Sequence, residues 1–483
     1  MKVLGKKGYS VLKSNLTSKE ELFIRKELTV KAYLPKSPVQ PEAFPLYRES
    51  PKKFYMPRQF GINTFGDFNE NKLSQGEDIN LEFKGDLREY QVNIVNKYMN
   101  AVKDSGGGLL DVDPGKGKTV MALNIISKLK KKTLVIVHKS FLLNQWIERI
   151  EQFLPSARVG KIQGQIIDID DKDIVIGMLQ SLSQKEYPEG TFDCFGLSIY
   201  DETHHLGAEV FSRCMMRTIT NYTLGLSGTM QRKDGLTKVF KMFLGDIVHK
   251  EKSNTSEHKV IVKAINYSVD DDEFNEIKYD YRGNPLYSTM ISKLCNYNHR
   301  SEFIIKVLQN ELSINNDQQI MILAHNKSLI TYLFKAIEHR NIATVGYYIG
   351  GMKEEELKKS ENKKVIIATY AMASEGLDIK TLTSLIMASP KTDVCQSVGR
   401  ILRTKHTSPM VIDIIDSHDI FEKQWNKRKQ YYIKQKYRII SSNNHDYIKD
   451  KWDILYDPLK NDESIKKIKK KEEPLKGVCL ITI

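Results

Sequence analysis

The stretch GGGLLDVDPGKGKTV, residues 106–120, joins a short apolar run to an amphipathic one through a loop rich in glycine and lysine. Successive backbone N–H groups in such a loop, together with the N-terminus of the following helix, form a site for a phosphate group. We expect Lys118 to reach the β- and γ-phosphates of a nucleotide and the Thr119 hydroxyl to bind Mg²⁺. Val112 stands where the strict form of this loop has a glycine. The predicted nucleotide-binding residues of the loop are Gly115, Lys116, Gly117, Lys118 and Thr119.

On both sides of this loop, apolar β-branched runs alternate with amphipathic stretches. The apolar runs are residues 107–112, 133–137, 173–177 and 197–201, and the amphipathic stretches are 120–130 and 140–154. This alternation predicts an α/β lobe built on a doubly wound parallel sheet. The pattern returns downstream, in the apolar runs 320–326, 365–370, 384–389 and 410–416 and the amphipathic stretch 329–340. The sequence therefore predicts two α/β lobes in tandem.

Changes in composition divide the chain into four parts. We expect an N-terminal accessory region over residues 1–85, a first lobe over 86–253, a second lobe over 254–440 with an insertion near 268–297, and a charged tail over 441–483. The N-terminal region has no clear periodicity, and its proline cluster favours turns and extended segments. Its stretch YRESPKKFYMPRQFG, residues 47–61, is either a site for nucleic acid or, as we favour, a solvated loop with a few packed aromatics.

The composition favours an intracellular protein with a polyanionic partner. The 74 Lys and Arg residues exceed the 60 Asp and Glu residues, which gives a net charge of +14. Such a surplus favours nucleic acid as partner, although it serves solubility as well. The five cysteines are scattered without a CxxC spacing, so we expect reduced thiols rather than disulfides or a zinc site. Neither a secretory signal nor an apolar run of membrane-spanning length is apparent, so we expect a soluble protein without membrane contact.

A pair of carboxylates, Asp201 and Glu202, follows the apolar residues LSIY, 197–200. Asp201 at the carboxyl end of a strand faces the phosphate loop across the sheet and can hold Mg²⁺ through water. Glu202 is placed to polarise an attacking water molecule. The sequence therefore predicts Mg²⁺-assisted chemistry on a nucleotide phosphate at the edge of the first lobe.

These motifs resemble those of superfamily 2 helicases of the DExH type, and further motifs follow in the order of that family. LREYQ (87–91) resembles the motif in which a glutamine, here Gln91, reads adenine. TLVIVHKSFLLNQW (133–146) and MLQSL (178–182) resemble motifs Ia and Ib, which track the nucleic-acid backbone. MILAHN (321–326) resembles motif IV, and ATYAMASEGLDI (368–379) resembles motif V. The resemblance implies RecA-like lobes and a coupling role for His204, Ser227, Thr229, Gly376 and Asp378.

QSVGRILR, residues 396–403, resembles the QxxGRxxR motif of the same family and assigns catalytic roles to Gln396, Arg400 and Arg403. Phosphoryl transfer requires positive charge near the γ-phosphate in the transition state. Arg400 and Arg403 are three residues apart and share one face of a helix. Because they belong to the second lobe, we expect them to reach the γ-phosphate only when the lobes close, which makes hydrolysis depend on closure.

Three features resemble the XPB-like branch, which includes the phage branch-migration helicase and helicases of large DNA viruses. They are LREYQ, the double histidine of DETHH (201–205) and LGLSGTMQRKDGL (224–236). The acidic centre of the branch's Arg-Glu-Asp element is basic here, in Arg232-Lys233-Asp234. Together with the abundance of Lys, Asn and Ile, the resemblance favours a viral enzyme acting in transcription, for example in transcript release, with the virion or host cytoplasm as its location and the transcription machinery as a partner.

We expect an ATP- and Mg²⁺-dependent DNA helicase or translocase. Two alternatives stay open: an RNA helicase, which a requirement for the 2′-OH would reveal, and a nucleic-acid-binding remodeller that hydrolyses nothing. The remodeller conflicts with the presence of Lys118, Asp201 and Glu202. A GTPase is disfavoured by Gln91 and by the QxxGRxxR motif.

Overall fold

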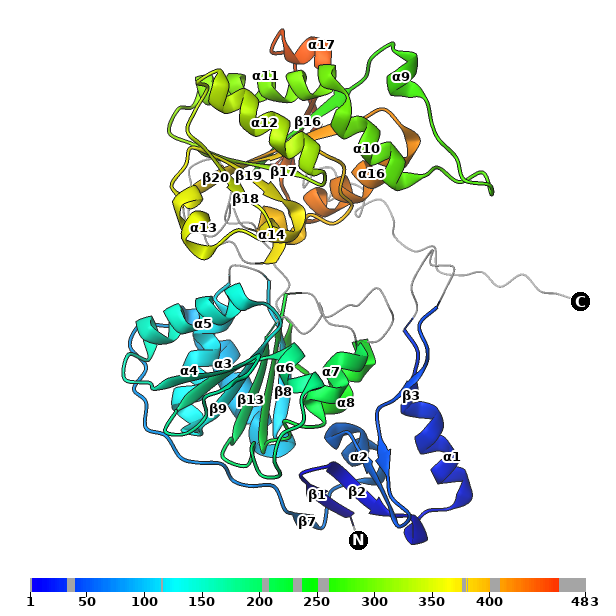
Figure 1. Cartoon of the computed structure of the whole chain (residues 1–483), viewed down its shortest axis with the longest axis vertical. Coiled ribbons are helices and arrows are strands. Elements are labelled where there is room, and N and C mark those ends of the chain that lie inside the picture. Colours follow the sequence, from blue (N-terminus) through cyan, green and yellow to red (C-terminus); the bar gives the residue numbers. More distant parts are fainter. Residues whose placement is uncertain are drawn as a thin grey trace, which may run out of the picture. The chain divides into compact units, whose positions relative to one another are not determined.

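The computed structural model divides the chain into two compact units, residues 1–252 and 253–483 (Figure 1). Each unit is described by itself. The structure describes residues 2–32, 40–113, 116–201, 208–228, 237–250, 260–375, 379, 381–399 and 409–459.

The first unit is built on an eight-stranded sheet with the order β11-β10-β12-β9-β13-β14-β8-β15, parallel except for β11. Its strands are β8 (Gly107–Asp111), β9 (Thr133–Val137), β10 (Val159–Gln163), β11 (Ile166–Ile167), β12 (Ile174–Met178), β13 (Leu197–Asp201), β14 (Tyr222–Ser227) and β15 (Ile247–Lys250). All four strands predicted for this lobe form, within one residue at each end. The sequence pattern did not predict β10, β11, β14 or β15.

Helices cover both faces of this sheet, as a doubly wound fold requires (Figure 1). They are α3 (Glu89–Ser105), α4 (Lys118–Leu129), α5 (Ser140–Phe153), α6 (Leu179–Gln184), α7 (Ala208–Met215) and α8 (Thr237–Leu244). Alternate residues of β9 belong to two different cores: Val135 and Val137 pack with α3, α4 and α5, whereas Leu134 and Ile136 pack with α6, α7 and α8. The central strands β9 and β12 are apolar throughout because both of their faces are buried.

Residues before α3 form a small α/β module that the sequence pattern did not reveal. Its sheet has the order β5-β6-β2-β1-β7, with a separate two-stranded pair β3-β4. The elements are β1 (Lys2–Gly5), β2 (Gly8–Leu12), η1 (Lys13–Asn15), α1 (Ser18–Glu27), β3 (Thr29–Val30), β4 (Phe44–Pro45), β5 (Arg48–Glu49), β6 (Lys53–Met56), α2 (Arg58–Phe65) and β7 (Glu70–Asn71). The strands have at most five residues, too few for a clear alternation.

The module is attached to the first lobe by a shared core and by hydrogen bonds. Its residues Tyr9, Phe54 and Phe60 belong to one apolar cluster with residues of α7 and α8. Arg58 Nη1 donates to the carbonyl of Asn221 at 2.7 Å, and Gln59 Nε2 donates to that of Ser105 at 2.7 Å. Because the stretch 47–61 supplies β5, β6 and the start of α2, it is a packed part of this module rather than the solvated loop that we favoured.

The second unit contains another eight-stranded sheet, with the order β18-β19-β17-β20-β21-β16-β22-β23, parallel except for β23. Its strands are β16 (Ile261–Tyr267), β17 (Gln319–Ala324), β18 (Val345–Tyr348), β19 (Val365–Thr369), β20 (Leu382–Met387), β21 (Met410–Asp416), β22 (Arg438–Asn443) and β23 (Asp453–Tyr456). Its helices are α9 (Asp272–Asn275), α10 (Tyr287–Asn296), α11 (Asn298–Ile314), α12 (Lys327–His339), α13 (Glu354–Glu361), α14 (Tyr370–Glu375), α15 (Cys395–Val398), α16 (Asp419–Lys434) and α17 (Asn444–Tyr447). The four strands and the helix predicted for this lobe all form.

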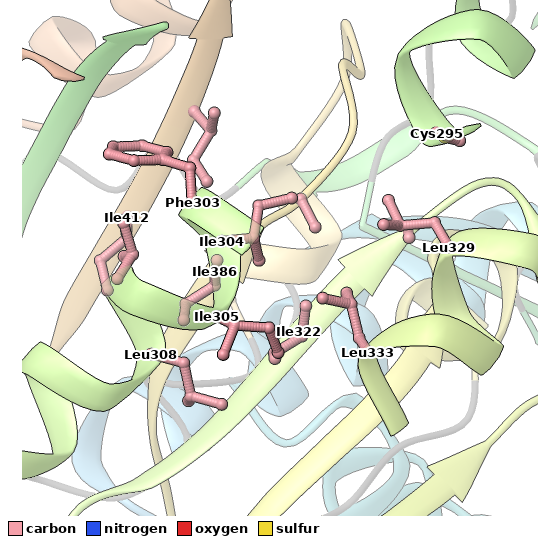
Figure 2. Packing of buried hydrophobic residues seen from close by; sticks show 14 of the residues in the cluster. Cys295, Phe303, Ile304, Ile305, Leu308, Ile322, Leu329, Leu333, Ile386 and Ile412 are labelled. Carbon is pink, nitrogen blue, oxygen red and sulfur yellow. The ribbon is translucent and has the colours of Figure 1, made fainter. Parts of the chain in front are cut away.

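The expected insertion near residues 268–297 lies inside the second unit and is partly core. It follows β16 directly, and Met290, Leu294 and Cys295 of α10 are buried in the main apolar cluster of this unit. Figure 2 shows this cluster, in which Cys295 lies with residues of α11, α12 and the central strands.

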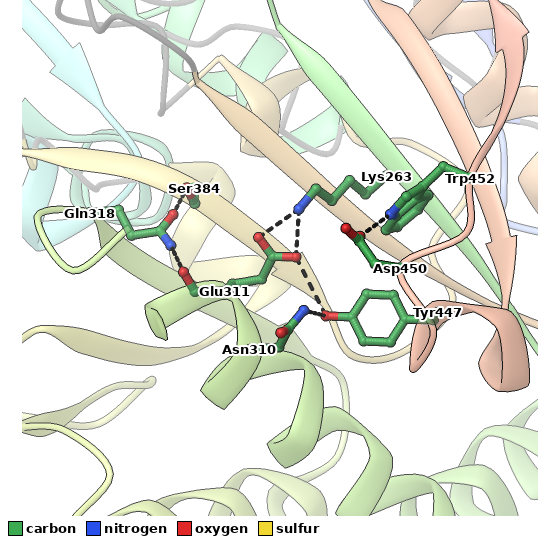
Figure 3. A network of polar contacts seen from close by, with 8 residues as sticks. All are labelled: Lys263, Asn310, Glu311, Gln318, Ser384, Tyr447, Asp450 and Trp452. Carbon is green, nitrogen blue, oxygen red and sulfur yellow. Dashed lines mark hydrogen bonds and ion pairs between the residues drawn. The ribbon is translucent and has the colours of Figure 1, made fainter. Parts of the chain in front are cut away.

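The expected boundary at residue 440 falls within β22, so the folded lobe continues into the predicted tail. Lys263 and Glu311 form an ion pair with an Nζ–Oε1 distance of 2.7 Å (Figure 3). The Tyr447 hydroxyl bonds to Glu311, and the Lys263 ammonium lies over the Trp452 ring. Although residues 441–459 are rich in charge, they form the end of β22, the helix α17 and the strand β23. β22 pairs with β16, and Tyr447 of α17 bonds to Asn310 of α11. Within the described ranges, no helix is long and apolar enough to cross a membrane.

Candidate nucleotide-binding and coupling site

Three adjacent parallel strands bring the predicted phosphate chemistry to one edge of the first sheet. β13, β14 and β8 are neighbours, so Asp201 is paired with Leu226, and Ser227 is paired with Asp111. The carboxyl ends of all three strands therefore lie at the same edge, where ligands of open α/β sheets bind. Asp201 lies two strands, and Ser227 one strand, from β8, which leads into the phosphate loop.

The strand β8 ends in the phosphate loop, and its departure from the strict motif has a packing explanation. The Val112 side chain is buried, and its backbone N–H donates to the Ser227 carbonyl at 2.9 Å. Val112 thus extends the strand pairing by one residue before the loop begins. Its side chain points into the core shared by α3, α4 and α5, so no close backbone approach to a ligand demands glycine here.

The loop ends at Gly117, which has a left-handed backbone conformation with φ of 79° and precedes the first turn of α4. A Cβ atom at this position would overlap the side-chain amide nitrogen of Gln91. Lys118 and Thr119 open α4, whose first turn contains no acidic residue. The N–H groups at the N-terminus of a helix attract a phosphate group.

The side chains of Gln91 and its neighbour Tyr90 form hydrogen bonds with the backbone of the phosphate loop. Gln91 Nε2 and the Tyr90 hydroxyl donate to the same carbonyl oxygen, that of Lys116, at 2.9 and 3.0 Å. Gln91 Oε1 accepts the backbone N–H of Arg88 at 2.9 Å, which caps α3. The Lys116 ammonium lies 5.5 Å from the centre of the Tyr90 ring. Gln91, the residue predicted to read adenine, therefore also connects the N-terminus of α3 to the phosphate loop through hydrogen bonds.

Asp201 is buried at the end of β13, where Trp146 of α5 donates Nε1–H to its Oδ2 at 2.9 Å. This bond fixes the orientation of a carboxylate at the carboxyl end of the strand. The carboxylate of Asp201 and the hydroxyl of Thr119 are hard oxygen ligands of the kind that Mg²⁺ prefers together with substrate phosphates, so the residues present fit that ion.

The segments resembling motifs Ia and Ib meet beside this edge. Gln180 of α6 donates Nε2–H to the His138 carbonyl at 2.9 Å, which ties the end of β12 to the end of β9. Lys139 follows as the N-cap of α5. Burial lowers the pKa of the Lys139 ammonium below its usual value. A partly desolvated cation at a carboxyl edge is suited to contact with phosphate.

In the second unit, the segments resembling motifs IV and V lie at the corresponding edge. β17 and β19 are paired, so His325 and Tyr370 follow neighbouring strands, and their ring centres are 4.8 Å apart. Burial, and then the nearby Lys391 ammonium, lower the pKa of His325 below its usual value. α14 contacts α15, which carries the first residues of the QxxGRxxR segment.

Several predicted site residues lie outside the described residues. Of Gln396, the structure describes the backbone within α15. The residues without a described position are Gly115, Glu202, His204, Thr229, Gly376, Asp378, Arg400 and Arg403. Their roles stay predictions, as does the Arg232-Lys233-Asp234 element.

Sequence reasoning missed two residues of this edge, Tyr90 and Trp146. Tyr90 lies within the quoted LREYQ motif, and Trp146 ends the quoted motif Ia stretch, so an aromatic residue inside each motif was the available signal. The spacing of the motifs does not predict which residue Trp146 contacts, because its hydrogen-bond acceptor, Asp201, is 55 positions away in the sequence.

Comparison with known proteins agrees with this geometry. Residues 84–232 match the family model described as the res subunit of type III restriction enzymes, and residues 303–405 match the helicase conserved C-terminal domain. A protein of Acanthamoeba polyphaga mimivirus, provisionally named an ATP-dependent RNA helicase, is 36% identical over 475 residues, which covers 95% of this chain and 90% of the relative. A relative from African swine fever virus with the same provisional name is 27% identical and covers 74% of this chain and 75% of its own length. The solved structure of S. cerevisiae Dbp5 bound to RNA and ADP BeF3 shares the fold, with a TM-score of 0.51, 12% identity and coverage of 85% of this chain and 96% of that one.

Two doubly wound lobes, a phosphate loop and a carboxylate two strands away define an ATP-driven enzyme of nucleic acids. The chain belongs to the superfamily 2 helicases, and it is an ATP-dependent helicase related to those of large DNA viruses.

Proposed function

We propose that the protein hydrolyses ATP to move along DNA as a helicase or translocase. The observation that carries this proposal is the alignment of β13, β14 and β8, which brings Asp201, Ser227 and the phosphate loop to one edge. This edge has the residue types that ATP hydrolysis requires. The basic net charge of +14 favours a nucleic-acid track.

In this proposal, the first lobe binds and orients the nucleotide. The backbone of residues 115–119 and the Lys118 ammonium bind the phosphates, while Gln91 contacts adenine and keeps the loop in register. Thr119 and Asp201 would hold Mg²⁺, which supplies charge neutralisation at the phosphates when bound. Glu202 orients the attacking water and takes its proton.

The second lobe completes the site only on closure. Arg400 and Arg403 stabilise the charge of the transferring γ-phosphoryl group, and Gln396 contributes to the same contact. Ser227, Thr229, His204, Gly376 and Asp378 link this event to the nucleic-acid surface. Because closure and opening move the lobes against each other, each ATP cycle shifts the bound strand.

The test is steady-state ATPase activity of the full chain with and without single- and double-stranded DNA and RNA. We expect stimulation by DNA and its loss in Lys118→Ala, the matched control for the nucleotide site. Stimulation of wild type by none of the four nucleic acids would contradict the proposal.

A second candidate is an RNA helicase, because the mimivirus and African swine fever virus relatives are provisionally named as ATP-dependent RNA helicases. Stimulation by RNA alone, lost when 2′-deoxy strands replace it, would select this alternative. The viral relatives also support a proposed context in viral transcription, with the transcription machinery as a partner.

A further inference from the structure

Four successive backbone carbonyls in the second unit are each held by a side chain from a different element. The Ala388, Ser389, Pro390 and Lys391 carbonyls bond to Arg300, Tyr370, His325 and Arg428, at 2.7, 2.6, 3.0 and 2.5 Å respectively. These residues follow β20 without forming a helix or strand. Loop carbonyls ordinarily bond to water or backbone, so here the side chains determine the course of the chain.

The two ends of this segment are fixed by buried ion pairs. Arg300 of α11 binds both carboxylate oxygens of Asp416, and Arg428 of α16 binds both of Asp413 with 2.8 Å contacts. All four side chains are at most 1% exposed. Because the carboxylate binds Nε and Nη2 of each guanidinium, the orientation of the group is fixed, and each arginine donates from Nη1 to one carbonyl.

The centre of the segment is held by the residues that follow β17 and β19. The Tyr370 hydroxyl donates to the Ser389 carbonyl, and the His325 backbone N–H donates to the Ser389 hydroxyl at 3.0 Å. The contact of His325 Nε2 with the Pro390 carbonyl assigns the hydrogen to Nε2. The segments resembling motifs IV and V thus meet on one short stretch of backbone.

This stretch leads directly into α15, where Ser397 and Val398 are buried, and onward to the QxxGRxxR arginines. We propose that Tyr370 and His325 are positioning residues that set the backbone of residues 388–391 and thereby the placement of the arginines at the γ-phosphate. This inference rests on the proposed function. A displacement of about 1 Å can lower a catalytic rate about 10²-fold, so the loss of one of four contacts is expected to be measurable.

The test compares Tyr370→Phe with Tyr447→Phe in the full chain. Both variants remove one hydroxyl group that makes hydrogen bonds in the same unit, but Tyr447 contacts Asn310 and Glu311, away from residues 388–391. With saturating nucleic acid, we expect Tyr370→Phe to lower kcat for ATP about 10-fold and to leave KM within about 2-fold. Tyr447→Phe should leave both within about 2-fold. Equal losses in the two variants, or no loss in Tyr370→Phe, would overturn the proposal.

A second readout excludes a merely structural role. In an Arg400→Ala/Arg403→Ala background, whose residual turnover is measured with radiolabelled ATP, Tyr370→Phe should have no further effect, because neither arginine is left to position. An equal fold loss in both backgrounds would overturn the inference. Absence of stimulated turnover in wild type would instead contradict the proposed function, so the two failures are distinguishable.

Variants of His325 provide an independent test if the Tyr370→Phe variant does not fold. His325→Ala removes the donor to the Pro390 carbonyl, whereas His325→Gln can supply an N–H from its amide. We expect kcat to fall in the alanine variant and to recover at least in part in the glutamine variant. Equal values in these two variants would contradict positioning by this bond.

Discussion

Gly117 has a left-handed backbone conformation and lies in the predicted nucleotide site. A side chain there faces both the cost of a left-handed backbone, about 1–2 kcal/mol, and overlap with Gln91. We therefore expect Gly117→Ala to raise the Kd for ATP at least about 10-fold, since each 1.4 kcal/mol is about a factor of ten. Titration with a fluorescent ATP analogue measures this. Gly164→Ala is the control, because Gly164 also has a positive φ, of 57°, but open space around it. Similar losses of affinity in both variants would contradict the steric explanation.

Trp146 shows what the residue pattern alone could not supply. The sequence identified Asp201 from its place after an apolar strand, but not the indole that binds it, because α5 and β13 meet only in the folded sheet. Trp146→Phe keeps an aromatic ring and removes the N–H. We expect a loss of about 1–3 kcal/mol in the free energy of unfolding, since Asp201 is buried, and a lower kcat with ATP binding retained. Urea denaturation and steady-state kinetics measure the two effects. Unchanged kcat would show that the bond does not orient the carboxylate for catalysis.

At the scale of elements, the most apolar of the parallel strands were predictable, whereas β14, β16 and the sheet margins were not. Strands such as β9 and β17 are buried on both faces, so they appear as continuous apolar runs. β22 mixes Arg438, Ser441 and Ser442 with only two isoleucines, and β23 is largely exposed. The N-terminal strands are short and lie among prolines. In the nucleotide site, the residue types and their order were predictable from the sequence. The hydrogen bonds of Tyr90 to the phosphate loop and of Trp146 to Asp201 were not, because they join different elements.

The folded part of the predicted tail gives a prediction for this scale. A chain ending at residue 440 lacks half of β22 together with α17 and β23, and with them the buried ring of Tyr447. Loss of one buried aromatic side chain alone costs about 3–5 kcal/mol. We expect this chain to lose cooperative unfolding of the second unit, as followed by urea denaturation and limited proteolysis. A chain ending at residue 459 is the control, because it retains every described contact. Equal stability of the two chains would contradict the assignment of residues 441–459 to the lobe.

At the scale of the whole molecule, the predicted catalytic groups are divided between the two compact units of the chain. The phosphate loop belongs to residues 1–252 and the QxxGRxxR segment to residues 253–483. Arg403→Ala should therefore abolish nucleic-acid-stimulated turnover while ATP binding by the first unit stays within about 2-fold, since an arginine finger contributes about 10³–10⁵-fold to rate. Lys118→Ala, in contrast, should weaken ATP binding itself. Unchanged turnover in Arg403→Ala would refute its catalytic role.

The surplus of positive charge gives the last prediction, which concerns the whole surface. If binding is mainly to phosphates, each contact releases counterions, and the logarithm of affinity falls linearly with the logarithm of salt concentration. For six or more phosphate contacts, we expect affinity to fall about 10³-fold or more between about 50 and about 200 mM salt. Fluorescence anisotropy with labelled single-stranded DNA and RNA, without nucleotide, measures the slope. Lys118→Ala is the control, because a residue that serves ATP should leave this slope unchanged. A flat response would exclude backbone tracking and would mean that the +14 charge serves solubility.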